Sequence, residues 1–209
     1  MDLFNQTDLF STDEIRKTEF DMPGADVTLF ENFFSKEESG RLYTSLLKNT
    51  NWEQDQLVIY GKEIDLPRLT AWYGDTNADD SYANTKRSVR PWTEDLLYIK
   101  ARIEEKVDVK FTRCLLNYYR DGEDSVNWHQ DYTGEERKNT VIGSVTFGAT
   151  RPFQLKHATR KDVKRIDIPL AHGSLLLMQG ATQENWMHKI PKTTKKIQPR
   201  INLTFRWVK

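Results

Sequence analysis

From residue 110 onward, hydrophobic and polar positions alternate in short runs that are separated by Gly, Pro and Asp. The runs are FTRCLLNYY (111–119), VIGSVTFGA (141–149), PFQLKHA (152–158), KRIDIPL (164–170), GSLLLMQG (173–180) and RINLTFRWV (200–208). Short runs of this kind, rich in β-branched and aromatic residues, predict strands. Six strands in close succession predict a β-sandwich or barrel, and the jelly roll is one closed form of this class.

The first half of the chain has a mixed pattern. Ser35 and Glu38 have the spacing of a capping box and precede a stripe of leucines at helical spacing, which predicts a helix over 35–47. The other elements expected here are a strand at 27–34, a strand at 68–75, a polar loop at 75–88 and a second helix at 91–107 that starts near Pro91 and Thr93. The fold class expected is therefore mainly β with flanking helices.

The chain of 209 residues is long enough for one sizeable core. Residues 1–22 are polar, acidic and aperiodic, and we expect them to form a mobile tail or a loosely docked arm. Residues 23–209 are expected to form a single domain, with the β-sandwich core over about 110–209.

Composition narrows the functional classes. No apolar run approaches the roughly 20 residues that span a bilayer, and the first residues lack a secretory pattern. The lone Cys114 has no internal partner, which is typical of the cytoplasm, or of the nucleus in a eukaryote. The formal net charge is zero, so bulk electrostatics does not predict nucleic-acid binding. Residues 186–209 hold seven Lys or Arg and no acid, which suits either a phosphate backbone or a solvated basic face.

The stretch VNWHQDYTG (126–134) places His129 two positions before Asp131. On a strand, residues i and i+2 share a face, so this pair can present an imidazole and a carboxylate to one metal ion. His188 is the best candidate for a third ligand, although His157 and His172 are also available. Two histidines and one carboxylate hold Fe(II) in non-haem oxygenases and leave positions open for a chelating cosubstrate and dioxygen.

The C-terminal run RINLTFR has the polar positions expected for such a cosubstrate. Alternation predicts one face made of Arg200, Asn202, Thr204 and Arg206. Guanidinium groups bind carboxylates in a bidentate manner, so a dicarboxylate such as 2-oxoglutarate suits this face. An edge strand with a wet polar face is the alternative. In LLNYY, Asn117 and Tyr119 share a face and offer amide and phenol donors.

Six segments together carry a resemblance to a known family. They are LPRLTAWYGD, LLNYYRDG, NWHQD, SVTFGATRPFQL, IPLAHGSLLLMQGATQENWMHKIP and PRINLTFR. In this order they resemble the AlkB family of Fe(II)/2-oxoglutarate dioxygenases, over roughly residues 65–209, and most of all its members that repair alkylated DNA and RNA bases. The resemblance implies a double-stranded β-helix (jelly-roll) core and a nucleotide-recognition lid at about 60–92.

The resemblance also implies residue roles. His129, Asp131 and His188 match the family's iron ligands, and the contacts to 2-oxoglutarate are matched by Asn117, Tyr119, Arg200, Asn202, Thr204 and Arg206. The implied reaction consumes 2-oxoglutarate and O2 and releases succinate, CO2 and the alkyl group as an aldehyde. No side chain is assigned as a general acid or base, because the metal and the cosubstrate carry the chemistry.

Aromatic side chains are the candidates for holding a base that has left the stack. Tyr82 resembles the family's lid tyrosine, and Trp72, Trp128 and Tyr132 are further candidates, although burial in a core also explains a tryptophan. The chain departs from the repair members at positions 132 and 133. Those members usually have an acid there, whereas this chain has Tyr132 and Thr133, which puts the lesion preference in doubt.

Three functions are consistent with these patterns. The one we favour is an oxidative dealkylase, with alkylated DNA or RNA as its partner and with a monomeric chain. The second is an oxygenase of the same chemistry that acts on a protein or a small molecule. The third, a non-catalytic nucleic-acid-binding module, leaves the metal-ligand set and the two arginines of RINLTFR without a purpose.

Overall fold

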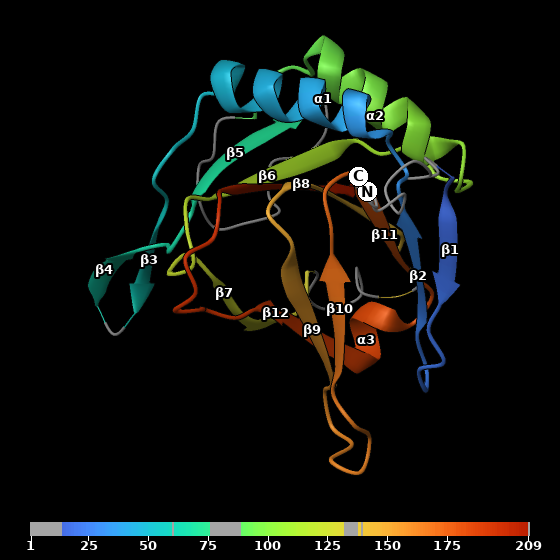
Figure 1. The fold of residues 1–209 in the computed structure, drawn as a ribbon. Coiled ribbons are helices and arrows are strands. Elements are labelled where there is room, and N and C mark those ends of the chain that lie inside the picture. The colour runs from blue at the N-terminus through green and yellow to red at the C-terminus, as the bar shows by residue number, and fades with distance from the viewer. Residues whose placement is uncertain (1–13, 60, 76–88, 132–137, 139, 209) are drawn as a thin grey trace, which may run out of the picture.

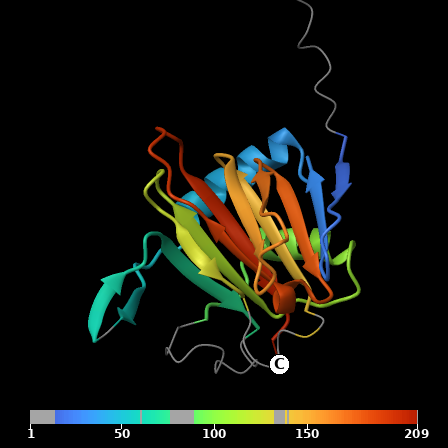
Figure 2. The same cartoon turned by 90° about the horizontal axis from the view of Figure 1, so that it is seen from below.

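The computed structural model describes residues 14–59, 61–75, 89–131, 138 and 140–208. Two antiparallel sheets face each other, and two helices lie across the outer face of the larger sheet (Figures 1 and 2). This is the mainly β, jelly-roll-like architecture that the alternating runs predict.

The larger sheet has seven strands and supplies one wall of the space between the sheets. In spatial order they are β1 (Arg16–Glu19), β2 (Asp26–Glu31), β11 (Ser174–Gln179), β8 (Ile142–Gly148), β13 (Arg200–Arg206), β6 (Arg113–Tyr119) and β5 (Leu69–Gly74).

The smaller sheet has four strands and forms the opposite wall. Its order is β10 (Ile166–Leu170), β9 (Arg151–His157), β12 (Trp186–Ile190) and β7 (Val126–His129), so β7 is an edge strand. The short helix α3 (Thr182–Asn185) connects β11 to β12. A separate hairpin is formed by β3 (Gln56–Ile59) and β4 (Lys62–Asp65).

Both expected helices are present. Helix α1 (Lys36–Asn49) begins at the capping box that the sequence predicts, because the Ser35 hydroxyl accepts from the Glu38 backbone and the Glu38 carboxylate accepts from the Ser35 backbone. Helix α2 (Glu94–Glu104) is capped by Thr93. Each helix buries one apolar stripe against the larger sheet (Figure 1).

Two apolar clusters stabilise the layers. One lies between the helices and the larger sheet and includes Leu42, Ile99, Leu203 and Phe205, all fully buried. The other lies between the two sheets, and its members include Trp186, which is also fully buried. Because β13 is central in the larger sheet, its apolar side chains pack under the helices while its polar ones face the space between the sheets. The alternative of a wet edge strand is therefore wrong.

The structure differs from the sequence expectations at several points. Part of the tail expected over 1–22 is ordered: Arg16–Glu19 forms strand β1, which pairs with β2, and Met22 is buried in the core between the sheets. Pairing to β2 satisfies the backbone of a stretch whose side chains are all exposed, so hydrophobic periodicity does not reveal it. Strands β3, β4, β7 and β12, which have four or five residues each, were not among the strands expected from the sequence.

Within the described part of the chain, no helix has the length and apolar character needed to cross a membrane. Residues 76–88, which include most of the loop expected at 75–88, lie outside the described residues.

Glu38 connects the two helices and generates a stability prediction. Its carboxylate accepts from the Tyr98 hydroxyl and pairs with Arg102, and the Tyr98 hydrogen bond is the main reason that its pKa falls from 4.5 to about 2. The folded state therefore gains stability above the unfolded pKa of 4.5 and loses it as the pH falls toward 2. We expect Glu38→Gln to lower the free energy of unfolding by about 1 kcal/mol at neutral pH, as measured by urea unfolding. The difference from wild type should shrink at acid pH.

Glu37→Gln is the matched control, because Glu37 is exposed in the same first turn and takes no part in this network. Equal losses for the two variants at neutral pH would contradict the assignment.

Candidate metal centre

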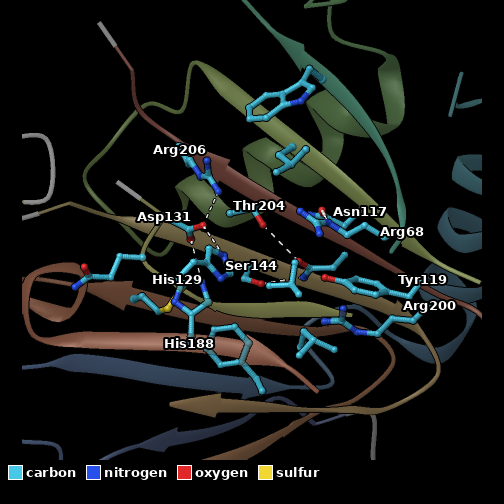
Figure 3. Close-up of a pocket in the computed structure, with 18 residues that line it drawn as sticks. Arg68, Asn117, Tyr119, His129, Asp131, Ser144, His188, Arg200, Thr204 and Arg206 are labelled. Atoms are coloured by element: carbon cyan, nitrogen blue, oxygen red, sulfur yellow. Dashed lines mark hydrogen bonds and ion pairs between the residues drawn. The ribbon is translucent and has the colours of Figure 1, made fainter. Parts of the chain in front are cut away.

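Three side chains converge between the two sheets. The nearest ligand atoms of His129, Asp131 and His188 lie within 4.8 Å of one another. Each histidine places its Nε2 at 3.7 Å from an oxygen of Asp131. His129 and His188 stand directly opposite each other on β7 and β12, so strand pairing itself brings the two imidazoles together (Figure 3).

A β-bulge in β7 sets the orientation of His129. Between the pairs His188↔His129 and Ile190↔Val126, β7 advances three residues while β12 advances two. Because of the extra residue, Val126 and His129 both line the cavity. The Asn127 carbonyl oxygen lies 2.8 Å from His129 Nδ1. A carbonyl can only accept, so Nδ1 carries the proton and Nε2 presents its lone pair to an ion.

Asp131 lies beyond the end of β7, so the strand geometry expected for the His–x–Asp pair does not hold it in place. The buried side chain of Gln183 holds Asp131 in place instead. The backbone N–H of Asp131 donates to the side-chain Oε1 of Gln183 at 2.8 Å. Gln130 Nε2 donates to the backbone carbonyl of Gln183 at 2.7 Å. Gln183 is 1% exposed and lies on α3, so this helix fixes the turn that carries Asp131.

The charges at the site suit a cation. Burial opposes ionisation of Asp131, but Arg206 at 2.6 Å and the two histidines hold the pKa of its carboxyl well below the ordinary value. Burial, reinforced by His129, lowers the pKa of His188 to about 3, so this imidazole is neutral at pH 7. An anionic carboxylate and neutral imidazoles are the protonation states that metal ligands require.

Beside the three ligand residues lies a cavity of about 200 Å³ whose walls combine polar and apolar side chains (Figure 3). The guanidinium of Arg200 is fully buried in one wall, and burial lowers its pKa to about 10. Its Nη2 donates to Thr146 Oγ1 at 2.9 Å, whereas Nε and Nη1 have no partner among the described residues. A buried cation with unmatched N–H groups fits an anionic ligand such as a carboxylate.

All the residues expected to contact 2-oxoglutarate line this same cavity. They are Asn117, Tyr119, Arg200, Asn202, Thr204 and Arg206. The ring of Tyr119 lies 5.1 Å from the Arg200 guanidinium and packs against it. Asn202 donates to Ser144 Oγ at 2.9 Å, so its amide is held by the neighbouring strand β8. The alternation read from RINLTFR is the physical origin of this wall, because β13 turns every second side chain inward.

The aromatic candidates for base binding differ in their position relative to the cavity. Trp72 lines the cavity, from β5. Trp128 does not line the cavity: it lies in the bulge of β7 and packs against Lys156 and Lys189. Tyr82 and Tyr132 lie outside the described residues.

The structure decides between the histidines that the sequence leaves open. His172 Nδ1 accepts from the backbone of Gly148 at 2.9 Å, and His157 Nδ1 accepts from the backbone of Arg160 at 3.0 Å. Neither lines the cavity. Only His188 has the position that strand pairing with β7 requires.

Several cavity residues were not singled out by sequence reasoning. Phe153 stacks on His188 with ring centroids 4.9 Å apart, and Arg68 donates from Nε to Asn117 Oδ1 at 2.7 Å. Ser144 and Met178 complete the walls. Arg68 stands within the segment LPRLTAWYGD that carries the family resemblance, which was the available signal. The others are ordinary strand residues whose roles depend on the packing of distant strands.

Comparison with known proteins supports the resemblance. The sequence model of the 2OG-Fe(II) oxygenase superfamily matches residues 26–206. Mouse "Alpha-ketoglutarate-dependent dioxygenase alkB homolog 3" is 38% identical over 192 residues, which are 87% of this chain and 66% of the relative, so the chain spans just under two thirds of that protein. Human "DNA oxidative demethylase ALKBH2" is 33% identical over 83% of this chain and 70% of its own length.

A solved structure agrees in fold. It is described as "The structure of OsALKBH1", and it covers 93% of this chain and 100% of its own chain with a TM-score of 0.63 at 15% identity. The jelly-roll core is therefore confirmed.

The contacts of Gln183 generate a test of the metal centre. Gln183→Leu removes the acceptor for the Asp131 backbone at nearly constant volume, so we expect metal affinity to fall about tenfold to hundredfold, measured by Co(II) titration. The control is Gln154→Leu, since Gln154 is also buried but bonds to Asp167 outside the cavity. Unchanged Co(II) affinity in a folded Gln183→Leu variant would refute the positioning role.

Proposed function

This chain belongs to the 2OG-Fe(II) oxygenase superfamily, in its AlkB branch, and we propose that it is an Fe(II)- and 2-oxoglutarate-dependent dioxygenase that removes N-alkyl groups from nucleic-acid bases. The observation that carries the proposal is the meeting, in one cavity, of a two-histidine, one-carboxylate ligand set with the buried Arg200, whose Nε and Nη1 have no hydrogen-bond partner among the described residues. The names of the AlkB relatives support nucleic acid as the substrate class.

In this proposal His129, Asp131 and His188 hold the ferrous ion. The donor set fits the metal because His129 presents Nε2, His188 is neutral and Asp131 is anionic. Asp131 and His188 have side chains only 6% and 5% exposed, whereas His129 is 39% exposed. The site therefore opens toward solvent on the β7 side, where a substrate can approach.

Arg200 binds the distal carboxylate of 2-oxoglutarate in this arrangement. Its free N–H groups lie in the cavity wall, and the Tyr119 ring holds the guanidinium in place. Arg206 mainly pairs with Asp131, because its Nη2 donates to Asp131 Oδ1 at 2.6 Å. Asn117, Asn202 and Thr204 supply further polar contacts around the diacid.

When bound, iron with 2-oxoglutarate and O2 supplies the oxidation that hydroxylates the N-alkyl carbon; one oxygen atom of O2 enters succinate as CO2 leaves, and the hydroxylated alkyl group leaves as an aldehyde. The chain orients the reactants and keeps bulk water from most of the site, as the burial of Asp131 and His188 indicates. No side chain is needed as a general base.

The target base must leave the stack to reach such a cavity. We expect Trp72 to contact it, and the position of this side chain in the cavity wall supports that role. Tyr82 and Tyr132 stay predictions in this respect, as does the lid at 60–92. We expect a monomer that acts in the cytoplasm, or in the nucleus of a eukaryotic cell.

The proposal is tested with methylated single-stranded DNA and anaerobically iron-loaded protein, by measuring formaldehyde and succinate together. We expect both products in equal amounts from the wild type and neither from His129→Ala, because the ion loses one of its three ligands. His157→Gln, on the same sheet but outside the cavity, should keep full turnover. Succinate without formaldehyde, stimulated by a peptide or a small molecule instead, would establish the alternative substrate class.

Substitution of Arg200 and substitution of Arg206 should have different effects on cosubstrate and metal binding. We expect Arg200→Met to raise the KM for 2-oxoglutarate about tenfold to hundredfold, with unchanged Co(II) affinity, because it removes charge-assisted hydrogen bonds to the diacid alone. Arg206→Met should weaken Co(II) binding as well, since Asp131 loses its partner. The KM for DNA serves as the control readout in both variants. Identical profiles for the two variants would contradict the division of roles.

A further inference from the structure

An aromatic side chain with two unneutralised cations lies on the outer face of the smaller sheet. Trp128 of β7 has Lys156 Nζ at 4.5 Å and Lys189 Nζ at 4.7 Å from its ring centroid. Lys189 comes from β12, which pairs with β7, and Lys156 comes from β9, the next strand beyond β12. We call these three residues the Trp128 cluster.

The bulge that orients His129 also creates this cluster. The residue that it inserts turns Trp128 away from the cavity, while Val126 and His129 face inward. Since β7 is the edge strand of the smaller sheet, Trp128 stands at the rim of the molecule, one residue from a metal ligand. Helices α1 and α2 lie over the other sheet, not over this face (Figure 1).

The electrostatics of the Trp128 cluster favour an anion. Within the described residues, neither Lys156 nor Lys189 forms a salt bridge, so the two like charges share one ring without a counterion. The neighbouring acid, Asp167, is already taken by Arg165 and Gln154. An indole ring attracts two ammonium groups but does not neutralise them. A phosphate placed between them would relieve their repulsion.

We propose that the Trp128 cluster binds the phosphate backbone of the nucleic-acid strand that carries the target base, on the flank that runs from the cavity over the edge of β7. This inference rests on the proposed function. His129, partly exposed, marks the opening of the cavity on this same edge, so a strand whose base enters there passes the Trp128 cluster next. The contact is independent of sequence and depends on strand length.

The test uses Lys156→Gln with Lys189→Gln, which removes both charges and keeps most of each aliphatic stem. Substrates are methylated single strands of about 5 and about 16 nucleotides, a span typical of single-strand binding sites. We expect the KM for the long strand to rise about fivefold and the salt slope of binding to shrink by about 1.4, which corresponds to two lost phosphate contacts. The KM for the short strand and for 2-oxoglutarate should not change.

Two controls isolate the effect. Lys36→Gln with Lys48→Gln removes the same charge from exposed positions on α1, across the molecule, and should leave the slope unchanged. Lys156→Arg with Lys189→Arg keeps the charge and should retain long-strand binding. Equal slopes for the cluster and α1 variants, or an equal loss on short and long strands, would overturn the inference. If the wild type demethylates neither strand, the proposed function fails, and the binding slope of the unmodified long strand still decides this inference.

Discussion

Asp131 remains ionised between two protein layers because the guanidinium of Arg206 lies 2.6 Å from it. Burying either charge alone would be strongly unfavourable, so each requires the other in place. Asp131 lies just beyond the end of an edge strand of the smaller sheet, and Arg206 ends β13, an interior strand of the larger one. The ion pair therefore ties the two sheets together at the point where the metal ligands meet. Gln183, from α3, accepts a hydrogen bond from the backbone N–H of Asp131 and so fixes the position of this residue.

The cavity occupies part of the space between the two sheets and so interrupts the apolar core that a sandwich normally has there. Strand β13 resolves this conflict through its two faces. Leu203 and Phe205 pack under the helices, in a cluster that stabilises the larger sheet from outside. Arg200 and Thr204 on the other face are then free to line a cavity. The helices α1 and α2 thus stabilise a sheet whose inner face, at β13, lines the ligand cavity.

The bulge in β7 has consequences on both sides of the smaller sheet. Inside, it supplies the Asn127 carbonyl that fixes the tautomer of His129. Outside, it presents Trp128 to Lys156 and Lys189. Metal binding and the proposed backbone contact would therefore depend on one local irregularity, and a strand held on the outside would lie close to the ion that acts on its base. Insertion of a single residue accounts for both features.

The sequence alone determined the features that depend only on local backbone geometry and side-chain chemistry. Alternation in RINLTFR predicted the polar wall, the Ser35 and Glu38 spacing predicted the start of α1, and the chemistry of His129 and Asp131 indicated a metal. Only the tertiary structure decided the features that depend on distant strand pairing. It selected His188 over His157 and His172, placed β13 in the interior of its sheet, introduced the bulge and brought Gln183 to the backbone of Asp131. Periodicity records which way a side chain points from its own strand, whereas the neighbour that it meets is set by registers between segments far apart in the chain.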